Sequence, residues 1–219
     1  MTKTSRRYGI VANVISYLQI MTVLVEFFLP WYLKRFCPGY DPKKMAMSLL
    51  GAATSPVSNL YNGWLIILGV ILSLSSASYF TSLSSKGKIV LAVLTSGALF
   101  LFALGAGILA GIFKVDADDK MRTLPSRIHG YSSAIGFMAL LFFPLLRSIA
   151  VFEDHCFIIG ILYLLIFSLS VLFFVLFVMS DKKIYKGTVI DREGTWERLT
   201  LLFLYLPIVI DSILFLSST

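Results

Sequence analysis

The chain contains six apolar stretches, each long enough to cross a lipid bilayer, separated by short polar connections. They cover residues 9–33, 57–81, 88–113, 125–151, 156–180 and 195–217. A helix needs about 20 apolar residues to cross a hydrocarbon core roughly 30 Å thick, and every stretch reaches that length. The sequence therefore predicts an all-α, polytopic transmembrane bundle in which residues 1–219 form one integral membrane domain.

Composition agrees with this fold class and excludes several others. Hydrophobic residues make up 58% of the chain and charged residues 14%, whereas soluble domains are about 45–50% apolar and about 25% charged. The chain has two cysteines and no block of like charge, which argues against a disulfide scaffold and a nucleic-acid binder. We expect a multi-pass plasma-membrane protein whose partners are membrane lipids or another membrane protein, and no nucleic acid.

The connection after the first span carries the signals of a short helix. Asp41 is suited to an N-cap, Pro42 to the first helical position and Gly51 to the C-cap. About nine residues cannot cross a bilayer. We therefore predict a short interfacial helix near 42–50.

An even number of spans places both termini on one side of the membrane. The connections after spans one, three and five then share the opposite side, which we call the loop-rich face. Most of the 19 Lys and Arg residues fall there, and this distribution favours a cytoplasmic loop-rich face. Lys3, Arg6 and Arg7 favour the reverse orientation, with the N-terminus inside.

The same topology limits disulfide and metal chemistry. Cys37 and Cys156 lie at opposite membrane surfaces, as do His129 and His155. A disulfide needs alpha carbons within about 7 Å, so the cysteines cannot pair. One haem cannot bind both histidines. His129 and two carboxylates could hold a divalent ion, but no ligand spacing in the sequence is diagnostic of a metal site. The sequence therefore leaves the cofactor unknown.

Small residues recur every four positions on the second and third spans, which favours close helix packing. They are Gly69, Ser73 and Ala77, then Ala103, Gly107 and Gly111. Pro144 and Pro207 are expected to kink the fourth and sixth spans.

Ionisable residues inside the spans are few and lie near helix ends, which weakens a transporter hypothesis. Arg147 and Asp211 both approach the terminal face, where either the two side chains pair or Arg147 alone extends to the membrane interface. On the first span, four polar residues share an arc of roughly 120° and predict one wall of a cavity that opens at the loop-rich face. They are Ser16, Gln19, Thr22 and Glu26.

The loop-rich face gathers the residues that could carry chemistry. A hydrolase hypothesis uses His129 as general base, Asp116 to orient it and Ser48 as nucleophile. In a binding hypothesis, Glu26 and Gln19 line the pocket, and Asn59, Asn62 and the basic residues of this face hold an anionic or sugar head group. Further acids on this face are Asp118, Asp119, Glu193 and Glu197. In the alternative without a functional site, His129 anchors its helix at the membrane interface, and Asn59 and Asn62 cap or bridge helices.

Several short segments of the chain resemble an uncharacterised family of bacterial and archaeal multi-pass proteins, catalogued as domain of unknown function 998. The family favours Pro where this chain has Lys114. The resemblance singles out Ser48, Asn62, Asp116 and His129, and it implies no activity. Its segments are Tyr40-Asp41, Ser48-Leu49-Leu50-Gly51, Pro56, Asn62-Gly63, Gly69, Gly107, Gly111-Ile112-Phe113-Lys114-Val115-Asp116 and His129-Gly130.

The leading functional hypothesis is a polar pocket on the loop-rich face that binds a lipid head group or small polar ligand. Lipid-modifying or hydrolytic activity at that pocket is a further hypothesis, so the sequence leaves open whether the protein is an enzyme. The first alternative is a non-enzymatic immunity or accessory protein whose loop-rich face docks a partner. A small-solute transporter ranks third.

Overall fold

The computed structural model describes residues 3–117 and 121–218, and every regular element in these ranges is helical. The long elements are α1 (Lys3–Leu33), α2 (Ser58–Ser85), α3 (Ile89–Phe102), the π-helix η3 (Ala103–Leu109), α4 (Ala110–Ile112), α5 (Leu124–Leu141), α6 (Phe143–Glu153), α7 (Phe157–Ser180) and α8 (Glu193–Ser217). Three short 3-10 helices lie in the connections: η1 (Lys34–Phe36), η2 (Met47–Gly51) and η4 (Lys183–Tyr185).

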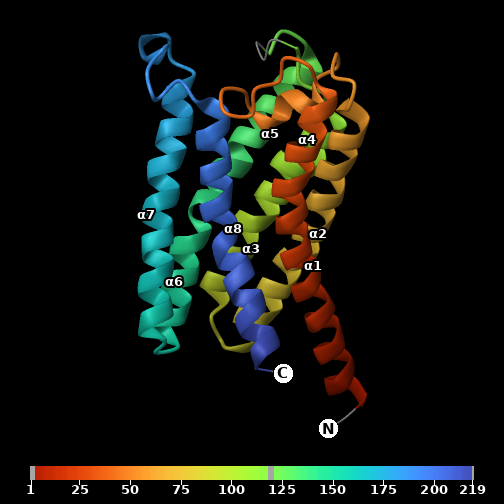
Figure 1. Cartoon of the computed structure of the whole chain (residues 1–219). Coiled ribbons are helices and arrows are strands. Elements are labelled where there is room, and N and C mark those ends of the chain that lie inside the picture. The colour runs from red at the N-terminus through yellow and green to blue at the C-terminus, as the bar shows by residue number, and fades with distance from the viewer. Residues whose placement is uncertain (1–2, 118–120, 219) are drawn as a thin grey trace.

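The described residues form six segments long and apolar enough to cross a membrane, which confirms the predicted bundle. Four are single helices, α1, α2, α7 and α8. The third combines α3, η3 and α4, and the fourth combines α5 and α6. Both chain ends lie at one end of the bundle, and the longer connections lie at the other (Figure 1). The loop-rich face is therefore a structural feature, to which residues 34–57, 113–117, 121–123 and 181–192 contribute.

Proline interrupts the fourth span where the sequence predicts a kink. The α-helix breaks at Phe142, and Pro144 occupies the first turn of α6. Proline has no N–H to donate, so it is tolerated at a helix start and disrupts a helix interior. Pro207 lies inside α8, which continues to Ser217.

The predicted interfacial helix near 42–50 takes a different form. Turns occupy 42–44, and only η2 is helical. The Asp41 carboxylate accepts a hydrogen bond from the Lys43 amide at 2.9 Å, which closes a turn two residues long. The Lys43 carbonyl accepts from the Thr195 amide at 3.0 Å. Residues 42–44 are thus hydrogen-bonded to the start of α8 through the Lys43 carbonyl, and they form turns in place of the first part of the predicted helix.

Small residues let α2 and η3 pack backbone against backbone. A Cβ built on Gly107 would lie 2.6 Å from the Gly69 Cα, and one built on Gly111 would lie 2.6 Å from the Asn62 carbonyl oxygen. Neither side chain could fit without moving a backbone. This confirms the packing predicted from the spacing of small residues.

Four polar groups meet between α2, α6, α7 and α8 near the terminal end of the bundle. Asp211 accepts two hydrogen bonds from the Arg147 guanidinium, at 2.7 and 2.9 Å. It also accepts from the Tyr79 hydroxyl at 2.9 Å and the Tyr163 hydroxyl at 2.7 Å. Of the two alternatives for Arg147, the structure therefore shows pairing with Asp211, and two tyrosines complete the network.

The polar stripe on α1 faces protein, as predicted, because all four of its residues are buried. Most of it does not face a cavity, however. The Gln19 Oε1 atom accepts a hydrogen bond from the Ser212 hydroxyl of α8 at 2.6 Å. Packing against α8 therefore occupies Gln19, and only Glu26 of the stripe lines the cavity described below.

Candidate functional site

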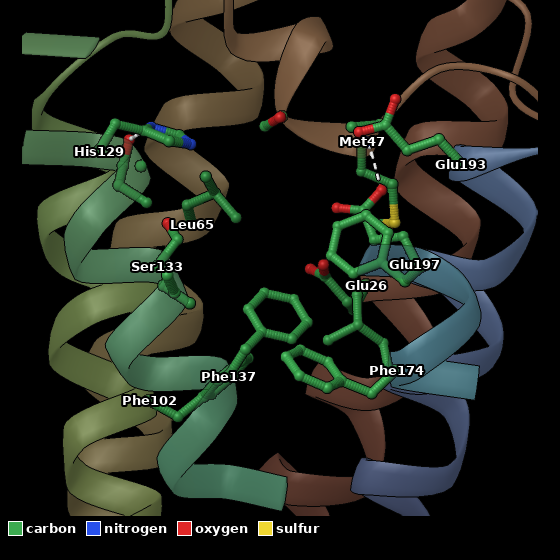
Figure 2. A pocket seen from close by; sticks show the side chains of 18 of the residues that line it. Glu26, Met47, Leu65, Phe102, His129, Ser133, Phe137, Phe174, Glu193 and Glu197 are labelled. Carbon is green, nitrogen blue, oxygen red and sulfur yellow. Dashed lines mark hydrogen bonds between the residues drawn. The ribbon is translucent and has the colours of Figure 1, made fainter. Parts of the chain in front are cut away.

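A cavity of about 240 Å³ lies within the bundle on the loop-rich side. In Figure 2, α5 forms one wall and presents His129, Ser133 and Phe137. The opposite wall presents Glu26, Phe174 and three residues near the loop-rich end: Met47, Glu193 and Glu197. The cavity is therefore polar toward the loops and apolar toward the bundle centre.

Glu26 of α1 lies at the junction of these two regions. Its side chain is 3% exposed, and its carboxylate accepts a hydrogen bond from the Trp64 indole at 2.5 Å. Burying a carboxylate is unfavourable unless it is paired or hydrogen-bonded. Trp64 of α2 supplies one such hydrogen bond, and this bond fixes the position of the Glu26 carboxylate in the cavity lining.

Two further glutamates come from the first turns of α8. Glu193 and Glu197 are four residues apart, so they lie on the same face of the helix. The Glu197 carboxylate accepts a hydrogen bond from the Met47 amide at 2.6 Å. The loop containing η2 therefore positions the carboxylate, and this bond also explains why Met47 lines the cavity.

Arg198, next to Glu197, is directed into the loop. Its guanidinium donates to the carbonyl oxygens of Pro42 and Gly194 at 2.6 and 2.7 Å and to the Tyr40 hydroxyl at 2.8 Å. Burial raises the pKa of Tyr40 to about 12, so the phenol stays neutral at physiological pH. This arginine holds the 40–46 loop on α8 and does not line the cavity.

The carboxylates in the described part of the lining come from three glutamates. The same part of the lining contains one histidine and two tyrosines, but neither lysine nor arginine. The chain as a whole carries a formal net charge of +7. The described lining is therefore richer in acidic than in basic side chains, in contrast to the chain as a whole.

His129 is held by the end of the preceding span. Its Nδ1 atom lies 3.0 Å from the Ala110 carbonyl oxygen and 2.9 Å from the Phe113 carbonyl oxygen. Because both partners are acceptors, Nδ1 carries the proton in the neutral ring and Nε2 is left as an acceptor. In Figure 2 the imidazole ring extends from α5 toward the cavity.

Asp116 is not brought to His129. Its carboxylate accepts from the Thr123 hydroxyl and the Arg122 amide, both at 2.7 Å, and from the Thr123 amide at 3.1 Å. These bonds lower the pKa of Asp116 below its ordinary value, and the bond from the Thr123 hydroxyl has the largest effect. The carboxylate fixes the turn that starts α5, and the carbonyls at the end of the third span hold His129.

Replacing Asp116 with Ala should loosen this turn. The Arg122 and Thr123 amides lose their acceptor, so their protection factors, which are exchange rates relative to an unstructured peptide at the same pH, should fall, and acidification should lower them in the wild type. A carboxylate with a lowered pKa stabilises the fold above its unfolded-state pKa and loses that effect as pH falls through the folded value. The protection factors of these two amides should therefore depend on pH in the wild type and not in the variant; equal protection factors in both would contradict this assignment.

The other predicted site residues fall in two groups. Ser48 lines the cavity together with Glu26 and His129. Asn59 accepts from the Lys114 ammonium at 2.8 Å, and Asn62 donates to the Gly51 carbonyl oxygen at 2.9 Å. Neither asparagine is among the described lining residues, because each bonds to the loop beside it.

Sequence reasoning did not identify Ser133 or the aromatic floor as part of the site. Ser133 lies four residues after His129, on the same face of the helix, and this spacing could have identified it. The floor includes Phe102, Phe137 and Phe174. Their spans contain many other large apolar residues, so the sequence does not distinguish these three. Asp118 and Asp119 lie outside the described residues. Within the described ranges, no group of three or more His, Cys, Asp or Glu residues could hold a metal ion.

Comparison with known families shows the wider relationship of the chain. A family model with the description "Protein of unknown function (DUF998)" matches residues 21–217. The chain belongs to the DUF998 family. The match includes parts of all six spans and every cavity-lining residue, from Glu26 to Tyr205. No curated protein and no solved structure matches the chain.

Proposed function

We propose that this DUF998 protein binds a ligand with a positively charged head group, such as a primary amine, in the cavity. The observation that carries the proposal is the set of charged residues in the described lining, which holds Glu26, Glu193 and Glu197 without lysine or arginine. A buried carboxylate attracts a cation more strongly than an exposed one, because water screens the interaction less. An ammonium group also donates hydrogen bonds that carboxylate oxygens accept.

This proposal keeps the predicted pocket for a head group but replaces the anionic or sugar head group expected from the sequence with a cationic one. A phosphate or other anionic head group would meet three carboxylates, an unfavourable arrangement in a partly desolvated site. Lys114 donates to Asn59 and Arg198 to the 40–46 loop, and neither is among the described lining residues. The charge pattern therefore favours a cationic head group over an anionic one.

Ligand binding also ranks ahead of hydrolysis for this cavity. His129 and Ser48 both line it, so two of the three groups in the hydrolase hypothesis share a space. The third, Asp116, bonds to Arg122 and Thr123 and is not available to orient the imidazole. Partner docking and transport have no comparably specific feature among the described residues.

The test compares three ligands of equal chain length on the full chain in phosphatidylcholine nanodiscs. Radiolabelled dodecylamine, dodecanol and dodecanoate differ only in the charge of the head group. We expect dodecylamine to bind at least tenfold more tightly than dodecanol, a difference of about 1.4 kcal/mol, and dodecanoate to bind most weakly. Equal or tighter binding of dodecanoate would overturn the proposal.

Variants of single carboxylates complete the experiment. Glu26→Gln should weaken dodecylamine binding about tenfold and leave dodecanol binding unchanged, because the amide keeps the size of the side chain but cannot form an ion pair with the ammonium. The matched control is Glu153→Gln on the terminal face, where the carboxylate lies 3.4 Å from the Lys88 ammonium and far from the cavity lining. Equal dodecylamine affinity in the Glu26 variant and the wild type would contradict a role for this carboxylate.

A further inference from the structure

The cavity reaches the outer surface of the bundle between α5 and α7. Ala134 of α5 and Val178 of α7 both line it, and both are exposed on the side of the bundle that faces lipid. Val178 is 47% exposed although it is a cavity residue. The two residues lie inside the segments that cross the membrane, so this opening faces hydrocarbon and not water.

The helices beside this opening barely touch, and aromatic rings fill the space between them. The ring centroids of Phe137 on α5 and Phe177 on α7 are 6.2 Å apart, and those of Phe174 and Phe177 are 6.5 Å apart. All three rings line the cavity. We call Ala134, Phe137, Phe177 and Val178 the α5–α7 seam. Its side chains are all apolar, and rotation of a ring would widen it without breaking a hydrogen bond.

We propose that the ligand is a membrane-resident amphiphile with a hydrocarbon chain and that it enters sideways from the bilayer through the α5–α7 seam. This inference rests on the proposed function and adds the class of ligand and its route. The alternative is a small water-soluble cation that enters from the loop-rich face, where Met121 and Glu193 line the cavity.

The order of polar and apolar groups along the cavity supports the lipid class. Glu193 and Glu197 lie at the loop-rich end, where lipid head groups lie, and Phe102 and Phe137 lie toward the bundle centre (Figure 2). A lipid of that leaflet has the same order, with its head outward and its chain toward the midplane. It can therefore slide through the seam without turning over or carrying its charge across the hydrocarbon core.

Narrowing the seam tests the route. Val178→Phe adds a ring at the seam, and Val175→Phe adds the same ring one turn away at a lipid-facing site of nearly equal exposure, 46% against 47%. The probe is dodecylamine brominated on its chain, which quenches Trp64 beside Glu26, in a chain carrying Trp31→Phe and Trp196→Phe. We expect Val178→Phe to slow both association and dissociation at least tenfold in nanodiscs and Val175→Phe to change neither.

A second pair of variants keeps the test decisive if Val178→Phe does not fold. Ala134→Phe narrows the seam from the α5 side, and Ile135→Phe is its control, because Ile135 is 60% exposed and is not a lining residue. Ethylamine, measured by competition with the probe, represents the water-soluble class and should bind at least tenfold more weakly than dodecylamine.

The outcomes separate this inference from the proposed function. If seam and control variants have equal rates, or if ethylamine binds as tightly as dodecylamine, the lateral route is overturned and the cationic cavity stands. If neither amine binds, both proposals fail. If association and dissociation of dodecylamine are slow only in the seam variants, entry from the bilayer is supported.

Discussion

Replacing Asp211 with Leu should destabilise the folded protein by about 3–5 kcal/mol. The substitution removes the acceptor of two hydrogen bonds from Arg147 and one each from Tyr79 and Tyr163. The Arg147 side chain is only 13% exposed, so it would be left charged and unpaired inside the bundle. Removing one partner of a buried ion pair costs more than removing both.

Unfolding in mixed micelles by added sodium dodecyl sulfate measures this effect. The double variant Arg147→Met/Asp211→Leu should recover most of the lost stability, because no buried charge remains. Asp154→Leu is the control: Asp154 pairs with Lys86 and Lys88 on the terminal face, its side chain is 32% exposed, and exposed pairs contribute about 0–1 kcal/mol. A single and a double variant of equal stability would refute the explanation by an unpaired charge.

Gly107→Ala should destabilise the bundle by about 3 kcal/mol, a large effect for one methyl group. The added Cβ would lie 2.6 Å from the Gly69 Cα and 3.2 Å from the Leu65 carbonyl oxygen. These are backbone atoms of α2, and they can move only if the helix moves. The substitution therefore forces α2 and η3 apart along a contact that consists of small residues.

Gly97→Ala is the matched control for this substitution. Gly97 lies on α3 in the same span, and a Cβ there would meet no heavy atom within 4 Å. Alanine favours a helix over glycine by roughly 0.5–1 kcal/mol, so this variant should be neutral or slightly more stable. The same unfolding assay applies to both, and a similar loss at Gly97 would show that helix packing is not the cause.

Features that depend on the membrane or on local spacing were predictable from sequence. Hydrocarbon thickness fixes the length of a spanning helix, so the six spans followed from hydropathy alone. Their even number placed Glu26, His129, Glu193 and Glu197 toward one face, and Figure 1 shows the resulting arrangement of loops and termini. The pairing of Arg147 with Asp211 was one of two alternatives, because a charged residue within a span either finds a partner or extends to the interface.

Features that depend on helix rotation and loop path were not predictable. The stripe on α1 gave the correct buried face, yet Gln19 bonds to Ser212 of α8 and only Glu26 reaches the cavity. Asp116 and His129 share the loop-rich face, but each takes its hydrogen bonds from the backbone nearest to it. Shared membrane depth therefore does not establish that two side chains meet.

The sequence by itself determined the membrane class, the six crossings, the end of the bundle that carries the polar residues and the close packing at Gly69 and Gly107. Only the tertiary structure decided which of those polar residues share a cavity, that Glu26, Glu193 and Glu197 meet in the described part of its lining, and that Val178, exposed on the outside of the bundle, is also a lining residue. The physical reason is that hydropathy constrains the depth of a residue in the membrane. The angle of each helix about its axis is set by side-chain contacts between helices far apart in the chain.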